Sequence, residues 1–152
     1  MVDIIGFDRY AKAETFKDYL LADCEAACAF AESVNKPCAA AEIGIADGIE
    51  LIANEDWYMT DLLDNIMSSD SCKRISYMLT WSNESPRRYW VPLPTDTTAP
   101  GFVSFSEDTQ TLFQGDVRWD QQRETYGYGF KSNEDDDVHD MDIKSVKGNK
   151  QH

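Results

Sequence analysis

The sequence predicts an α/β fold in which parallel strands alternate with helices. Three short apolar segments, 2–7, 38–42 and 75–81, have the composition of strands buried on both faces. Segments of helical periodicity separate them, as the crossover connections of parallel strands require. No G-x-G-x-x-G or G-x-x-x-x-G-K turn follows any of the three, which argues against a nucleotide-binding open sheet. Periodicity alone leaves both an open doubly wound sheet and a barrel possible.

The first strand and the helix after it are the clearest elements. The strand VDIIGF at 2–7 is rich in β-branched residues and stops at Asp8. Between Glu14 and Val34 the apolar positions step by three or four residues, which predicts one face of a helix that Asn35 and Pro37 end. That face comprises Phe16, Leu20, Cys24, Ala27, Ala31 and Val34.

The next elements follow the same alternation. A strand of small residues at 38–42 precedes a loop, and residues 59–67 form a second amphipathic helix that Asn54 or Asp56 caps. The third strand, ISYMLTW, spans 75–81.

The last third of the chain has weaker signals. The connection at 82–101 contains four prolines and is expected to be irregular, and a weak helix is expected over 106–113. Periodicity is lost after Gly115, so we expect an α/β domain at 1–115 and an irregular or disordered acidic tail at 116–152.

Composition and charge exclude several classes of protein. With 42% apolar residues and 12% aromatics, the 152 residues can form a core. The net charge is −14, and residues outside 131–152 still carry −12, so a nucleic-acid partner is not expected. No apolar stretch could span a membrane, and the N-terminus MVDIIGFDRY lacks the features of a signal peptide.

The four cysteines, Cys24, Cys28, Cys38 and Cys72, form no C-x-x-C pair, and both histidines lie in the tail. We therefore expect neither a zinc site nor any other metal or cofactor. The preferred interpretation is that the cysteines are buried thiols filling small core positions. A bridge between Cys38 and Cys72 remains an alternative, because spacing does not reveal connectivity.

Groups that can do chemistry follow each strand. Asp8 and Tyr10 follow the first, Glu42 the second, and Trp81 and Asn83 the third. The carboxyl ends of parallel strands lie at one edge, where such folds bind ligands, so these groups are expected to converge. Taken singly, Asp8 fits a turn and Trp81 fits a core, so the prediction depends on their coincidence with Glu42.

The strand period gives Glu42 a specific setting. Cys38, Ala40 and Glu42 are expected on one side of their strand, so that small residues lie beneath the carboxylate. Asp8 and Tyr10 share one side of theirs. A carboxylate beside a tyrosine hydroxyl suits a nucleophile or an acid/base group.

Four segments together carry a family resemblance. VDIIGFDRY, AAAEIGIADG, DWYMTDLLDNI and ISYMLTWSNESPRRYWVPLP resemble, in order, the C-terminal part of glycoside hydrolase family 26, the endo-β-1,4-mannanases. The resemblance covers about residues 2–115. It implies a (β/α)8 TIM barrel of which this chain supplies the last three βα units.

The resemblance also implies roles for residues. Glu42 is similar to the catalytic nucleophile of a retaining glycosidase, and Tyr10 to the residue that hydrogen-bonds it. Substrate-binding positions implied in the same way are Asp8, Trp81, Asn83 and Tyr89, with Trp81 stacking on the sugar.

Two departures from the family limit these expectations. Ser82 stands where the family often has arginine, and the acid/base glutamate lies on an earlier strand that is absent here. Retaining glycosidases need two carboxyl groups about 5 Å apart, and such a barrel needs about 250 residues. We therefore expect a fragment that is inactive without the missing N-terminal half, from an enzyme acting on β-mannan at an extracellular, periplasmic or cell-surface location.

Three alternatives remain at this point. The chain could belong to another retaining β-glycanase, such as a cellulase. It could be a noncatalytic glycan-binding remnant that uses Trp81, Tyr89 and Trp90 as stacking surfaces. It could also be an independent small α/β domain with an unrelated role.

Overall fold

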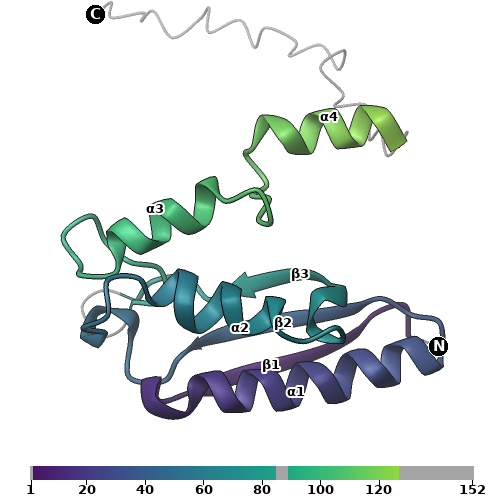
Figure 1. The fold of residues 1–152 in the computed structure, drawn as a ribbon, viewed down its shortest axis with the longest axis horizontal. Coiled ribbons are helices and arrows are strands. Elements are labelled where there is room, and N and C mark those ends of the chain that lie inside the picture. The colour runs from purple at the N-terminus through teal and green to yellow at the C-terminus, as the bar shows by residue number, and fades with distance from the viewer. Residues whose placement is uncertain (1, 85–88, 127–152) are drawn as a thin grey trace, which may run out of the picture. The chain divides into compact units, whose positions relative to one another are not determined.

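The computed structural model describes residues 2–84 and 89–126. The chain divides into two compact units, residues 1–111 and 112–152. The expected boundary at 115 therefore differs by a few residues from the observed division. The first unit holds a parallel sheet and the helices packed on it (Figure 1).

Three parallel strands form the sheet, as the sequence predicts. They are β1 (Ile5–Ala11), β2 (Cys38–Ile45) and β3 (Ile75–Thr80), in the spatial order β1-β2-β3. β1 and β2 extend further than expected at their carboxyl ends, so Tyr10 and Glu42 lie within strands. Extended backbone therefore fixes the directions of both side chains.

An irregularity in β2 changes which side of the sheet Glu42 faces. Phe7 pairs with Ala40, whereas the next residue of β1, Asp8, pairs with Glu42. Ala41 is thus an extra residue in β2, and such a bulge reverses the alternation of side chains beyond it.

The expectation that Cys38, Ala40 and Glu42 share one side is therefore wrong. Cys38 packs with Ala31 of the helix side, and Ala40 lies in the main core. Glu42 instead meets Tyr10 on the opposite side of the sheet. A period of two cannot reveal a bulge, because the extra residue carries no signature in a run of alanines.

The first crossover is the helix α1 (Ala13–Ser33), close to the expected span. After its last turn, Asn35 adopts a left-handed conformation with φ 52°, and the Lys36 N–H donates to Ala31 O at 2.9 Å. This arrangement closes the helix C-terminus. Its buried face differs from expectation at two positions, since Cys28 replaces Ala27 and Val34 is exposed; it comprises Phe16, Leu20, Cys24, Cys28 and Ala31.

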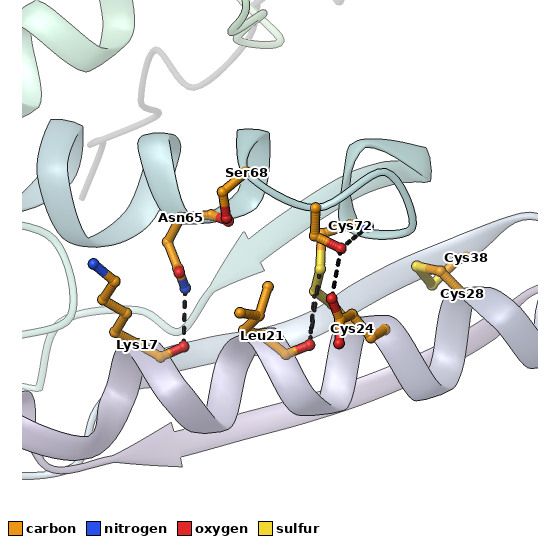
Figure 2. The surroundings of a disulfide bond; sticks show 10 residues. Lys17, Leu21, Cys24, Cys28, Cys38, Asn65, Ser68 and Cys72 are labelled. Carbon is orange, nitrogen blue, oxygen red and sulfur yellow. Dashed lines mark hydrogen bonds between the residues drawn. A yellow bond between two sulfur atoms is a disulfide. The ribbon is translucent and has the colours of Figure 1, made fainter.

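The second crossover packs beside α1. A short 3-10 turn, η1 (Ile49–Leu51), precedes the π-helical η2 (Tyr58–Leu63), which continues into α2 (Asp64–Met67) and is followed by η3 (Cys72–Arg74). The expected helix at 59–67 is therefore confirmed in position. The buried Asn65 side chain donates to Lys17 O of α1 at 2.9 Å (Figure 2).

Two disulfides overturn the interpretation of the cysteines as thiols. Cys24 of α1 is bonded to Cys72 of η3, and Cys28 of α1 to Cys38 of β2 (Figure 2). The Cα–Cα distances are 5.3 and 5.1 Å, within the usual range for disulfides. The alternative bridge between Cys38 and Cys72 is also wrong, because α1 presents Cys24 and Cys28 one turn apart to two different elements.

The elements after β3 differ most from expectation. A helix, α3 (Ala99–Glu107), begins inside the segment expected to be irregular, and residues 108–113 lie outside it. Pro100 occupies its first turn, where a missing N–H costs nothing. In the second unit, α4 (Val117–Tyr126) lies where an irregular tail was expected, and none of its residues is buried. The expected disorder of 127–152 falls outside the described residues.

Candidate functional site

The site is built on the two adjacent strands β1 and β2. Tyr10 Oη donates a hydrogen bond to Glu42 Oε2 at 3.0 Å, and both side chains are partly buried. Burial, the hydrogen bond to Glu42 and the negative charges of Glu42 and Asp8 raise the pKa of Tyr10 to about 12. The phenol therefore stays neutral near pH 7 and acts as a donor to the carboxylate.

A tryptophan and a glycine define the space around Tyr10. The Trp90 ring meets the Tyr10 ring nearly edge-on, with centroids 5.0 Å apart. Gly44 pairs with Tyr10 in the sheet, and a Cβ at Gly44 would lie 2.8 Å from both Tyr10 Cε1 and Trp90 Cε3. Only glycine leaves room for both rings.

Asn83 fixes the backbone around Trp90. Its Oδ1 accepts hydrogen bonds from the N–H groups of Trp90 at 2.7 Å and Val91 at 2.9 Å. Its Nδ2 donates to Val91 O at 2.8 Å. The sequence suggested a substrate contact for Asn83, whereas these bonds serve the protein backbone.

Tyr89 is likewise engaged with the protein. Its N–H donates to Glu50 Oε2 at 3.2 Å, and its carbonyl accepts from the Ile49 N–H at 2.8 Å. Its partly buried side chain packs against the main core. The structure thus places the Tyr89 backbone as a link to η1.

Asp8 and Trp81 lie at the margins of the site. Asp8 is exposed and pairs with Glu42 in the sheet register. Trp81 follows Thr80, which pairs with Ile43, so the backbone of Trp81 lies beside the segment after Glu42. The Trp81 side chain is 49% exposed, which suits a surface for ligand contact better than a core position.

The structure therefore brings Tyr10, Glu42 and Asp8 together and adds two residues that sequence reasoning undervalued. The sequence alone suggests Trp90 only as a stacking surface and suggests no role for Gly44. The alternation of β2 offered one signal for Gly44, since a glycine two residues beyond a functional carboxylate marks a close approach. Within residues 2–84 and 89–126, no group of His, Cys, Asp and Glu side chains could hold a metal ion.

Solved structures of known proteins share this fold. A family 26 endo-β-1,4-mannanase catalytic domain from Bacillus sp. JAMB-750 is 31% identical with a TM-score of 0.64, over 74% of this chain and 32% of that one. A family 26 β-mannanase from Bacteroides ovatus is 28% identical with a TM-score of 0.64, over 76% and 32%. A modular family 26 endo-β-1,4-mannanase from Cellulomonas fimi is 28% identical with a TM-score of 0.62, over 74% and 26%.

The chain matches part of a family 26 glycoside hydrolase catalytic domain. It covers only 26–32% of the chains of these relatives. No family model matches the sequence, and a comparison with curated proteins found no match. The resemblance inferred from the four sequence segments is thus confirmed at the level of the family 26 catalytic domain. None of the helices in the described part of the chain is long and apolar enough to cross a membrane.

Proposed function

We propose that the chain is the C-terminal part of a retaining endo-β-1,4-mannanase-like enzyme and that Glu42 is its nucleophile. The observation that carries this proposal is the hydrogen bond from Tyr10 Oη to Glu42 Oε2 at 3.0 Å, on neighbouring strands of a family 26-like sheet. It gives one carboxylate in the described site a fixed orientation. The names of the related structures supply the substrate class, β-1,4-mannan.

In this mechanism Glu42 attacks the anomeric carbon and forms a covalent glycosyl-enzyme intermediate, which water then hydrolyses with retention. The bond from Tyr10 occupies Oε2 and leaves Oε1 for the attack. Because the pKa of Tyr10 is raised to about 12, its hydroxyl remains a donor throughout the neutral range. Trp81 offers an indole for the apolar face of a sugar, and Asp8 lies beside Glu42 in the sheet register.

The reaction needs a second carboxyl group about 5 Å from Glu42 to protonate the leaving oxygen. We propose that further strand-helix units, supplied by an N-terminal half, provide it. The consecutive strand order, with both crossovers packed side by side on one face, fits a barrel as well as one half of a doubly wound sheet, and the similarity to family 26 catalytic domains favours the barrel. Within the described residues the outer edges of β1 and β3 have no strand partner.

Trapping of the intermediate tests the role of Glu42 in the protein completed with the rest of such a barrel. A 2-deoxy-2-fluoro-β-mannosyl fluoride should label the peptide containing Glu42, as read by mass spectrometry. Glu42→Gln should abolish both the labelling and the release of reducing sugar from mannan, because the amide is a poor nucleophile. Glu14→Gln, at an exposed carboxylate of α1, is the matched control and should leave both unchanged. Mannan hydrolysis by Glu42→Gln at the wild-type rate would refute the proposal.

A glycan-binding role without catalysis is the second candidate, and the exposure of Trp81 favours it. Tyr89 and Trp90 contribute less to this alternative, because one packs on the core and the other on Tyr10. In that case Glu42→Gln should still bind mannan oligosaccharides, and Trp81→Ala should lose the binding. Isothermal titration of the two variants tests this binding, and the trapping experiment separates the candidates, because only a catalytic Glu42 becomes labelled.

We also propose that the protein folds in an oxidising compartment, outside the cytoplasm. The two disulfides support this location, because such bonds persist in exported proteins and are rare in reducing compartments. Alkylation of the exported protein without a reductant should modify none of its four cysteines. Complete alkylation under those conditions would contradict the proposal.

A further inference from the structure

The side-chain amide of Asn83 has little capacity left for a ligand. An asparagine side chain offers two donor hydrogens and an oxygen with two lone pairs. Both lone pairs of Asn83 Oδ1 are used by the N–H groups of Trp90 and Val91, and one donor is used by Val91 O. The three bonds, at 2.7, 2.9 and 2.8 Å, all go to the backbone of two consecutive residues.

The indole that Asn83 positions has no polar anchor of its own. Trp90 Nε1 is buried and has no hydrogen-bond partner among the described residues. Leaving such a donor unpaired costs about 1–3 kcal/mol, so the indole is not drawn to its place by this group. Its position depends on the backbone that carries it and on the rings it touches.

The Trp90 ring in turn packs against Tyr10, the residue that donates a hydrogen bond to Glu42. Its centroid lies 5.0 Å from that of Tyr10, and Gly44 keeps the space between β2 and the two rings free. Tyr10 Oη then reaches Glu42 Oε2 at 3.0 Å. A continuous series of contacts therefore runs from Asn83 through Trp90 and Tyr10 to the carboxylate.

We propose that Asn83 is a positioning residue, which holds Trp90 against Tyr10 and thereby keeps the Tyr10 hydroxyl on Glu42. This inference deepens the proposed function, on which it rests for the role of Glu42. It replaces the sugar contact that the sequence suggested for Asn83.

The test observes Tyr10 in the 152-residue chain without any substrate. Tyrosine carrying ¹³C at Cζ is introduced, and the Tyr10 signal is identified by its absence from Tyr10→Phe. A pH titration then gives the pKa of Tyr10, with far-UV circular dichroism confirming the fold at each pH. The wild-type pKa should be about 12.

Asn83→Ala should lower the pKa of Tyr10 toward about 10, the value of a free phenol, because the ring gains water and loses its fixed bond to Glu42. Asn83→Asp keeps the oxygen acceptor for both N–H groups but loses the donor to Val91 O, and should lower the pKa of Tyr10 less than Asn83→Ala does. If Asn83→Ala does not fold, Trp90→Leu carries the test, since it leaves the Asn83 bonds in place and should also lower the pKa.

Asn54→Ala is the matched control. Asn54 also makes three bonds, one to Asp56 and two to Thr60 and Asp61 of η2, but it lies outside the series of contacts that ends at Glu42. It should leave the pKa of Tyr10 unchanged. An unchanged pKa of Tyr10 in a folded Asn83→Ala would overturn the proposal, and so would an unchanged pKa in Trp90→Leu or an equal shift in Asn54→Ala. A failure of mannan hydrolysis would bear only on the proposed function.

Discussion

At the scale of single residues, the candidate site depends on a neutral phenol between two negative charges. Tyr10 donates to Glu42, and the charges of Glu42 and Asp8 both oppose loss of its proton. The same bond fixes one oxygen of Glu42 while the other remains for chemistry. Gly44 makes this geometry possible, because a Cβ at this position would lie 2.8 Å from atoms of both the Tyr10 and the Trp90 ring.

Gly44→Ala tests that requirement. The new Cβ would lie 2.8 Å from atoms of both rings, so one ring must move. We expect a loss of about 1–3 kcal/mol in the free energy of unfolding, the usual cost of an overpacked site, together with a changed NMR signal of Tyr10. Urea denaturation measures the first quantity. Gly115→Ala is the control, since a Cβ there meets nothing within 4 Å, and an equal loss in both variants would contradict the steric argument.

At the scale of elements, periodicity predicts those features that depend on packing against a single neighbouring element. The face of α1 and the position of η2 and α2 follow from apolar spacing, because each buries one stripe. The side of β2 that Glu42 occupies could not be predicted, because the bulge at Ala41 depends on pairing with β1. The disulfide partners also depend on tertiary structure, since they join residues 48 and 10 positions apart.

The last helices illustrate a different limit. The four prolines at 82–101 predict an irregular connection, yet Pro100 lies in the first turn of α3, where a proline sacrifices no hydrogen bond. α4 buries no residue, so it has no apolar period to detect. Within the site, Tyr10 and Glu42 are predictable from the family resemblance, whereas the position of Trp90 depends on how the loop that carries it folds back, with its N–H hydrogen-bonded to Asn83.

The two disulfides should contribute unequally to the stability of α1 on the sheet. Cys24–Cys72 closes a separation of 48 residues and Cys28–Cys38 one of 10. The chain-entropy relation gives about 4 kcal/mol for the first and about 3 kcal/mol for the second. We expect the double variant Cys24→Ala, Cys72→Ala to unfold at lower urea concentration than Cys28→Ala, Cys38→Ala. The reverse order would show that lost packing outweighs loop closure at the second pair.

At the scale of the whole molecule, the open sheet is the dominant feature. β1 and β3 have neighbours on one edge only among the described residues, and side chains of β3 remain in water. Tyr77 is 42% exposed and Leu79 is 54% exposed. An edge strand that is unpaired and carries exposed apolar side chains can bind another strand, which agrees with the proposal that further strand-helix units complete a barrel.

This feature predicts self-association of the chain when it is studied without further strand-helix units. Its apparent mass in light scattering should rise with protein concentration, because edges of one copy pair with those of another. Leu79→Lys should reduce the association, since a charge on an edge strand opposes pairing. Val103→Lys is the matched control, because Val103 is 52% exposed but lies on α3, and it should leave the association unchanged. A wild-type chain that stays monomeric at every concentration would show that the edges of β1 and β3 are already protected. Unpaired edges would then no longer support the proposal that further strands complete the sheet.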